Sequence, residues 1–487
     1  MSRINTNVSS LIAQNRLSST NADLATRLQR LSTGLRINRG ADDPAGLIVS
    51  ERLRAEIQSV GQAVDNAERA SNVIATTEAA LDEVNQLLVS IKSLTIEAAN
   101  TGAFSPEEIR ANQLEIDSAV ESITRISNTA SFAGLKLLNG SLEFLQSGAV
   151  TSQISDIQIN GANFGLDSNL PVNVEVIASA ERAELFLSGN TTGFVGQLQS
   201  SVTLEIQGNI GVQTFSFVSG TALSAVAAAV NQIRDATGVT AALVSAGDPS
   251  SGLVFNSQEF GTDAFVSVRA IEGGEAFQAF DAQAGNAVLR DEGADVTALV
   301  NGNLAVGQGL DVTLNTPTLN VDLTLTSGAA QVLNTNYDFS VTGGGALFQI
   351  GASVNSLQQV GFGLNSVAAS RLGSERTGFL NSIRTGGSNS LVSGNARAAS
   401  EIIDASIDQV SQLRGRLGAF ERNTLQTTVR SQNIALENLT AAESAIRDAD
   451  FAEETAALTR AQILQQAGTS TLALANSTAQ NVLALLQ

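Results

Sequence analysis

The chain has 487 residues, a formal net charge of −20, and neither cysteine nor histidine. These absences exclude a disulfide framework, a Cys/His zinc site and a Ser-His-Asp triad, and the acidic balance disfavours nucleic acid, because phosphate binding needs a basic surface. No uncharged apolar run reaches the ~20 residues of a membrane span, and the segment after Arg3 is too polar for a cleaved secretory signal. By these signals alone the protein would be cytoplasmic, although export without a cleaved signal stays open.

Residues 1–43 are predicted to form an N-terminal helical arm. Leucines recur at helical spacing from Leu17 to Leu31, and Gly34 and Gly40 then interrupt the pattern. Residues 1–40 carry six arginines against one aspartate, whereas residues 441–487 carry five acidic side chains against two arginines. The two ends of the chain are therefore expected to attract each other.

Residues 44–165 are predicted to form the N-terminal part of a helical shell domain. Asp43 is the expected cap of a helix with Pro44 in its first turn. After a break at residues 101–106, Ser105 can cap a second helix that starts with Pro106. Between these points, mostly apolar residues recur at alternating steps of three and four, which is typical of the seam of a packed helix or coiled coil. They are Ile74, Thr77, Leu81, Val84, Leu88, Ile91, Thr95 and Ala98.

Residues 166–346 are predicted to form a mainly β, outward-facing insertion. Of the 42 glycines, 26 lie within residues 161–371, and residues 161–346 carry 18 acidic against four basic side chains. Alternating residues at 202–217, a helical run at 222–233 and an apolar run at 239–244 predict a strand-strand-helix-strand unit, and residues 310–325 predict a β-hairpin. The glycines at 343–345 are interpreted as a flexible turn, because the Lys-Ser/Thr of a phosphate loop does not follow them.

Residues 347–449 are predicted to form the C-terminal part of the shell domain. One seam of alternating three- and four-residue steps precedes a shift of phase, and a second seam follows it. The first consists of Ile403, Ser406, Val410, Leu413, Leu417 and Phe420, and the second of Leu436, Leu439, Ala442 and Ile446.

Residues 450–487 are predicted to form a C-terminal helical arm that carries no charge after Arg460. Its apolar residues cover more than one face, so the helix needs partners on several sides. Assembly is favoured over a membrane surface, because an interfacial membrane helix normally carries Lys or Arg on its polar face.

The two ends of the chain resemble bacterial flagellin. At the start, INTN at 4–7, LQRLSTGLRIN at 28–38 and DDPAGL at 42–47 are similar to the N-terminal signature of that family. At the end, AQILQQAG at 461–468 and NVLALL at 481–486 are similar to its C-terminal signature. The resemblance covers about residues 1–165 and 347–487, and the unit that starts at Val202 is similar to an insertion repeat of some flagellins and filament-cap proteins.

The resemblance implies an α+β fold with discontinuous helical arms and a helical bundle from both termini. It implies a secreted, structural subunit of the extracellular bacterial flagellum, without cofactor, metal or membrane insertion, that polymerises with itself into a helical filament for motility. Export in an unfolded state through the flagellar type III secretion channel and polymerisation at the tip are also implied. The partners that the resemblance implies are the filament cap, hook-junction proteins and a flagellin export chaperone, and co-assembly with other flagellins stays open.

Assembly is expected to use the terminal arms, and the shell helices are expected to pack along their seams. The arm residues expected to take part are Leu17, Leu24, Leu28, Leu31, Leu35, Ile463, Leu464, Leu472, Val482, Leu483, Leu485 and Leu486. The expected shell seam consists of Leu81, Val84, Leu88, Ile91, Leu413, Leu417 and Phe420.

The resemblance also places a surface read by the vertebrate flagellin-sensing Toll-like receptor on the helix around residues 88–94. Leu94 and Glu115 match the family pattern, but Ser90 stands where the family has arginine. Serine does not make the geometry-specific, charge-assisted bonds of arginine. We therefore expect weakened receptor recognition.

Four alternatives were weighed against a filament subunit. A flagellin subclass carries a zinc protease with an H-E-x-x-H motif, which a chain without histidine lacks. Hook–filament junction proteins share the general plan and are the nearest rival, followed by a secreted adhesin or surface-array protein. A carboxylate-dependent glycosidase is the enzyme alternative, but the acidic residues of 166–346 are scattered over alternating strands, as on a solvated face.

Overall fold

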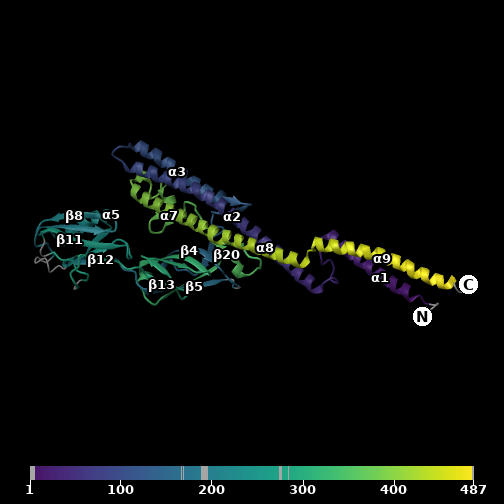
Figure 1. Ribbon diagram of the computed structural model, residues 1–487. Coiled ribbons are helices and arrows are strands. Elements are labelled where there is room, and N and C mark those ends of the chain that lie inside the picture. The colour runs from purple at the N-terminus through teal and green to yellow at the C-terminus, as the bar shows by residue number, and fades with distance from the viewer. Residues whose placement is uncertain are drawn as a thin grey trace. The chain divides into compact units, whose positions relative to one another are not determined.

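The computed structural model describes residues 6–165, 167, 169–187, 196–273, 277–282 and 285–484. The fold is α+β, with helices from both ends of the chain and a β-rich middle, as predicted (Figure 1). The chain divides into two compact units. The first contains residues 1–69, 350–354 and 422–487, and the second contains residues 70–349 and 355–421.

The first unit is helical. It contains α1 (Val8–Thr33), α8 (Gln426–Arg447), α9 (Phe451–Ala484) and the N-terminal half of α2 (Pro44–Ala99). α1 ends where Gly34 adopts a left-handed φ of 73°, a conformation that glycine takes without steric cost. α2 begins at Pro44, and the Asp43 side chain accepts a hydrogen bond of 2.9 Å from the Gly46 amide. The predicted helix start is thereby confirmed.

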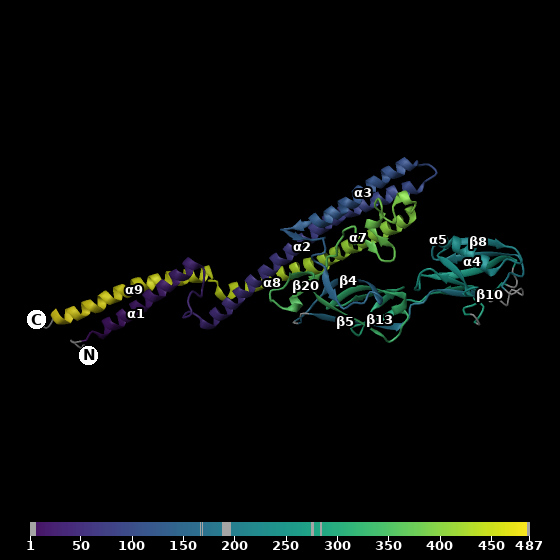
Figure 2. The same cartoon turned by 180° about the vertical axis from the view of Figure 1, so that it is seen from behind.

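The long helices of the second unit are the rest of α2, α3 (Pro106–Thr129) and α7 (Ala396–Phe420), which lie side by side in Figures 1 and 2. The predicted start of α3 is confirmed, because Ser105 and Glu108 form a reciprocal capping box. Arg414 of α7 pairs with Asp82 of α2 at 3.0 Å, and a second ion pair joins Lys92 to Asp404.

The shell-seam residues lie inside this bundle. The fully buried or nearly buried members are Leu81, Val84, Leu88, Ile91, Leu413 and Leu417. Phe420, at the end of α7, is half-buried, and its ring centroid lies 6.1 Å from that of Phe348 and 5.1 Å from that of Phe362. Aromatic pairs at this spacing stabilise the end of the helix.

The predicted shift of phase between the two C-terminal seams has a structural cause. Residues Glu421–Leu425, between α7 and α8, form a turn of π-helix. A π-turn inserts extra backbone into an α-helix and rotates every later side chain around the axis. The apolar pattern of α8 therefore cannot continue in the register of α7.

The first β-rich lobe of the second unit consists of two antiparallel sheets that share one core. One sheet has the order β14-β13-β5-β18-β3 and the other the order β15-β16-β17-β4. Val174, Val321 and Leu323 are among the buried residues of the shared core. The strands are β3 (Phe144–Ser147), β4 (Ile154–Ala162), β5 (Leu170–Ala178), β13 (Thr297–Val300), β14 (Asn303–Leu304), β15 (Val306–Gln308), β16 (Asp311–Asn315), β17 (Leu319–Leu325) and β18 (Asn336–Gly344), with the short helix α6 (Ser327–Ala330) after β17.

The predicted hairpin is confirmed, because β16 and β17 pair with Asn315 opposite Asn320. β3 and β4 belong to the same lobe although they precede residue 166. The helical part of segment 44–165 ends at Thr129. We therefore propose that the β-rich region starts near Phe144.

The second β-rich lobe contains the predicted strand-strand-helix-strand unit, which is confirmed. β7 pairs with β8, α4 follows, and β9 pairs with β10. Leu204, Val226 and Phe255 lie in its core. Its elements are β6 (Glu184–Leu187), β7 (Val202–Gly208), β8 (Val212–Phe217), α4 (Leu223–Gln232), α5 (Arg234–Thr237), β9 (Val239–Ser245), β10 (Asp248–Ser257), β11 (Phe265–Gly273) and β12 (Arg290–Glu292).

Short two-stranded pairings complete the strands of the second unit. They are β1 (Ser131–Phe132) with β2 (Leu135–Lys136), β19 (Ala346–Gln349) with β20 (Gln359–Phe362), and β21 (Gly373–Ser374) with β22 (Gly378–Phe379). Among the described residues, no helix is both long and apolar enough to cross a membrane.

The interpretation of the glycines at 343–345 as a flexible turn was wrong. Gly343 and Gly344 are the last residues of β18, and Gly344 pairs with Phe144 of β3 across a register shift. Gly345 has a φ of 76°, and a Cβ there would lie 2.5 Å from the ring of Phe144. The glycines therefore let a bulged strand end pass close to an aromatic ring.

We predict that Leu88→Ala destabilises the helical bundle by about 2–5 kcal/mol, because it removes a fully buried side chain and leaves a cavity. Val89→Ala is the matched control, since Val89 is the next residue of α2 and is 53% exposed. Thermal unfolding followed by circular dichroism measures both. Equal stability of the two variants would contradict the packing of this seam.

Candidate functional site

The two terminal helices form an antiparallel pair, in which the start of α1 lies against the end of α9 (Figure 2). The Asn7 side chain donates a hydrogen bond of 2.9 Å to the Ala475 carbonyl, and the Ser10 hydroxyl donates one of 2.8 Å to Asn476. Near the other end of the pair, Arg27 contacts Glu454.

The pair has a coiled-coil period on both sides. Buried or half-buried positions of α9 recur at steps of four and three, and those of α1 do the same. The α9 positions are Glu454, Leu458, Ala461, Gln465, Gly468, Leu472 and Ala475, and the α1 positions are Ala13, Leu17, Thr20, Leu24, Arg27 and Leu31.

Small residues let the two helices approach closely. Ala13 and Ala461 are buried, at 7% and 6% exposed. A Cβ added at Gly468 would lie 3.2 Å from Cδ1 of Leu17, which is tighter than ordinary van der Waals contact. The two helices therefore lie close together at these positions.

Glu454 is the charged centre of the seam. Its side chain is 7% exposed, and its two oxygens lie 2.9 Å from Arg27 and 3.0 Å from Arg30. Burial alone would raise the pKa of Glu454, but the hydrogen bonds from Arg27 and Arg30 outweigh burial and hold the pKa below its ordinary value. Glu454 in turn raises the pKa of Arg27 through its hydrogen bond.

A strap of backbone hydrogen bonds joins the segment after α1 to the segment before α9. The Arg36 amide donates to the Arg447 carbonyl at 2.7 Å, and the Ala449 amide donates to the Gly34 carbonyl at 2.9 Å. The Arg36 guanidinium donates to the Ile446 carbonyl at 2.6 Å. Backbone hydrogen bonds, as well as side-chain contacts, therefore join the two ends of the chain.

The loop between α1 and α2 is closely packed. Ile37 is 1% exposed, and the amides of Asn38 and Arg39 both donate to the Asp42 carboxylate, at 3.0 and 2.9 Å. A Cβ at Gly46 would lie 2.7 Å from Cδ1 of Ile37. The two N-terminal motifs at 28–38 and 42–47 thus encode the end of one helix, a packed loop and the start of the next.

Large apolar side chains of the two arms lie outside this seam. Ile463 is 62% exposed and Leu464 is 53% exposed. The other exposed members of this outward apolar set are Val8, Leu11, Ile12, Leu28, Phe451 and Leu474. The seam thus combines leucines with small and polar residues, while a second set of large apolar side chains lies outside it and is exposed.

The expected arm residues divide between these two surfaces. Leu17, Leu24, Leu31, Leu35 and Leu472 are half-buried, whereas Leu28, Ile463 and Leu464 are exposed. Val482 and Leu483 lie within α9, but the positions of their side chains are not described. Leu485 and Leu486 lie outside the described residues.

Sequence reasoning missed several residues of both surfaces. Glu454, Ala461 and Gly468 line the seam, and Val8, Leu11, Ile12, Phe451 and Leu474 extend the outward set. A search for large apolar residues passes over these three seam positions because they hold a carboxylate, an alanine and a glycine. The seven-residue spacing from Glu454 through Ala461 and Gly468 to Ala475 is the signal that could have found it.

The residues of the expected receptor surface lie on α2 and α3. Ser90 and Glu115 are exposed, and Leu94 is half-buried. Exposed apolar neighbours, Ile96 on α2 and Leu114 on α3, accompany them.

Comparisons with known proteins agree with the terminal motifs. The bacterial flagellin N-terminal helical region matches residues 4–143, and the bacterial flagellin C-terminal helical region matches residues 400–486. Flagellin from Salmonella rubislaw is 31% identical over 99% of this chain and 99% of its own length. The chain belongs to the bacterial flagellin family. It is a structural protein of the extracellular flagellar filament, which serves motility, and is not an enzyme.

Further comparisons extend this result. Flagellin B from Helicobacter pylori strain 26695 is 29% identical over 100% of this chain and 99% of its own length. The flagellin hook IN motif matches residues 202–259, which include the predicted strand-strand-helix-strand unit and β10. The solved flagellar hook associated protein-3 from Legionella pneumophila has a TM-score of 0.31 at 11% identity, over 81% of this chain and 98% of its own length. A score this low supports no inference.

We predict that Glu454→Gln weakens the pairing of α1 with α9 by about 1.5–3 kcal/mol, because hydrogen bonds between charged groups are lost. Hydrogen exchange of peptides from both helices in the monomer measures the effect, and exchange should become faster. Glu453→Gln is the matched control, since Glu453 is the exposed neighbour. Equal exchange in the two variants would show that Glu454 does not hold the pair.

The same pairing should weaken in acid. Because the folded-state pKa of Glu454 is lowered, its contribution is complete above its ordinary value of 4.5 and is lost as the pH falls below that value through the folded-state pKa. In the Glu454→Gln variant this part of the pH dependence should be absent.

Proposed function

We propose that the chain enters the filament through its paired terminal helices, residues 1–43 and 450–487. One observation carries the proposal: a second set of large apolar side chains, among them Ile463, Leu464 and Leu474, lies outside the seam and is exposed in the single chain. An exposed apolar set of this kind marks a surface that another molecule covers. In a homopolymer, the covering molecule is another copy of the same chain.

The energetic argument follows from burial. Complete burial of a Leu, Ile or Phe side chain stabilises by roughly 1.5–3 kcal/mol. Four such side chains are more than half exposed in the single chain, namely Ile463, Leu464, Leu474 and Phe451. Assembly therefore gains the free energy of burying them, which the isolated helix pair does not gain. The absence of charge after Arg460 supports the same proposal, because no charged side chain would have to be desolvated there.

The remaining segments have proposed places around this core. Residues 44–143 and 347–449 supply the helical shell, and the β-rich region from near Phe144 to residue 346, with 18 acidic side chains in 161–346, projects outward into solvent. The buried bundle seam at Leu88 and Leu417 supports the first assignment.

We further propose export in an unfolded state through the flagellar type III secretion channel and polymerisation at the filament tip. Family membership supports this route, and the absence of cysteine leaves no disulfide to hinder threading. The outward apolar set needs cover before assembly, which supports binding of an export chaperone. The filament cap, hook-junction proteins and other flagellins are proposed as partners on the family resemblance.

We predict that a chain ending before Ala461 does not polymerise, while its β-rich lobes stay folded. Seeded polymerisation of purified monomer, viewed by negative-stain electron microscopy, tests this, with circular dichroism as the check on folding. Long tubes from the shortened chain would contradict the role of the C-terminal arm.

A more specific test of the C-terminal arm uses substitutions in the full-length chain. Ile463→Ser with Leu464→Ser should abolish seeded growth but leave hydrogen exchange of α1 unchanged, because both residues face away from the seam. Thr469→Ser with Thr471→Ser, exposed positions on the same helix, is the control and should polymerise normally.

We predict that recognition by the flagellin-sensing Toll-like receptor is weak and that Ser90→Arg strengthens it, because arginine restores a charge-assisted donor on an exposed position of α2. A reporter-cell assay on monomer measures the potency. Ser59→Arg, at another exposed position of α2, is the control for added charge. Full potency of the unmodified chain would contradict the prediction.

A further inference from the structure

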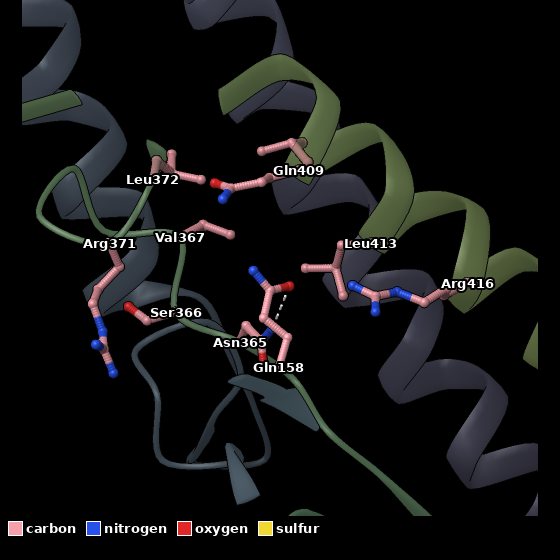
Figure 3. Close-up of a pocket in the computed structure, with 10 residues that line it drawn as sticks. Gln158, Asn365, Ser366, Val367, Arg371, Leu372, Gln409, Leu413 and Arg416 are labelled. Atoms are coloured by element: carbon pink, nitrogen blue, oxygen red, sulfur yellow. Dashed lines mark hydrogen bonds between the residues drawn. The ribbon is translucent and has the colours of Figure 1, made fainter. Parts of the chain in front are cut away.

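A small polar cavity lies within the second unit, between β4, the loop at 365–372 and α7 (Figure 3). Its volume is about 50 Å³. Apolar side chains such as Val367 and Leu413 form part of the wall, and polar side chains form the rest. The polar members are Gln158, Asn365, Ser366, Arg371, Gln409 and Arg416.

Arg416 reaches from α7 toward Gln158 in Figure 3. Its guanidinium is the polar group whose hydrogen bonding the contents of the cavity would complete. One of its terminal nitrogens lies 3.3 Å from the Asp322 carboxylate of β17, which also accepts a hydrogen bond of 2.8 Å from Asn160 of β4. Burial lowers the pKa of Arg416. Its Nε is buried and has no hydrogen-bond partner among the described protein atoms, and a buried donor without an acceptor is costly.

Two other polar groups beside the cavity are already engaged. The backbone N–H of Gly373 donates to the side-chain oxygen of Gln409 at 2.9 Å, and the side-chain nitrogen of Gln409 donates to the Gly373 carbonyl at 2.7 Å. Arg371 points away from the cavity in Figure 3 and donates to Glu143 at 3.3 Å. Neither residue therefore accepts a hydrogen bond from Arg416 Nε: the Gln409 oxygen already has a donor, and the Arg371 guanidinium has no acceptor atom.

The side-chain amides of Gln158 and Asn365 line the cavity, and the Gln158 nitrogen already donates to Asp156 at 3.1 Å. The Asn365 amide nitrogen lies 3.5 Å from the Gln158 oxygen, at the outer limit of a hydrogen bond. The cavity thus offers both donors and acceptors. This mixture suits water, because an anion would meet the Asp322 carboxylate nearby and a cation would meet the Arg416 guanidinium.

We infer that this partly open cavity is a site of ordered water and that its water bridges Arg416 Nε to the side-chain oxygens of Gln158 and Asn365. A single water needs roughly 10–15 Å³ of such space, so the cavity holds a small cluster. The water positions the guanidinium for its ion pair with Asp322. β4, β17 and α7 are then joined by a hydrated polar contact and not by apolar packing.

Filling the cavity distinguishes a wet site from a dry one. Val410 is 1% exposed and lines the cavity, so Val410→Ile adds one methyl group to it. In the otherwise unchanged chain, this variant should lower Tm by about 2 °C, because displaced water leaves the Arg416 Nε without a partner. A rise in Tm would mean that the cavity is dry and would overturn the inference.

A paired background isolates Arg416. In a chain with Asp322→Asn and Arg416→Met, which removes the guanidinium and its counter-charge together, Val410→Ile should no longer lower Tm. Equal shifts in the two backgrounds would overturn the link between the water and Arg416. Calorimetry of the full-length monomer measures all four chains.

A second variant and a control distinguish loss of the bridging water from destabilisation by overpacking alone. Asn365→Ala removes one proposed bridging amide, and it should lower Tm in the unchanged chain but not in the paired background. Val174→Ile, in the core of the first β-rich lobe and not among the cavity residues, should give the same shift of Tm in both backgrounds. A loss from Asn365→Ala that is equal in both would count against the bridge.

Discussion

The carboxylate of Glu454, held between Arg27 and Arg30, is the interaction on which the pairing of the chain's two ends depends. A buried charge is tolerated only where partners compensate its desolvation, so the pair has one favourable register, with Glu454 opposite the two arginines. The backbone strap between Arg36 and Arg447 acts in the same direction. Ends that are more than 400 residues apart in sequence are thereby brought into one unit.

This register determines what the arms present to other molecules. Once Ala13, Ala461 and Gly468 occupy the seam, Ile463 and Leu464 must lie on other faces of α9. A seam of larger residues would make a more stable pair, but it would leave less apolar surface for contacts between subunits. The chain thus combines an internal pairing of its ends with exposed apolar side chains on the same helices, which suits a subunit of a polymer.

The second unit is built on the opposite plan. Its helices bury Leu81, Leu88 and Leu417 in their own bundle, and its two β-rich lobes each have a closed core. These parts bury their large apolar side chains within a single chain. Where the first lobe meets α7, Arg416 and Asp322 form a polar contact, whereas Phe420 at the end of α7 packs against the rings of Phe348 and Phe362.

Local elements were accessible from sequence because short-range rules govern them. Asp43 with Pro44, and Ser105 with Pro106, capped helices as expected, and the hairpin around residues 315–320 formed in the expected place. The glycines at 343–345 were misjudged, because the same residue type serves turns and bulged strand ends, and the Phe144 ring that distinguishes them lies 200 residues away. The phase shift after Phe420 was visible in the pattern, but its π-turn was not.

The sequence by itself determined the family, the helical ends and β-rich middle, the opposite charges of the two arms and the need of the last arm for partners. These follow from periodicity, composition and motifs, which are local properties. Only the tertiary structure decided which arm residues face inward. Leu17 and Leu28 lie on one helix and are chemically identical, yet Leu17 contacts Gly468 and Leu28 faces solvent. That difference depends on the register between two distant helices, which Glu454 and its two arginines set, and no single segment contains that information.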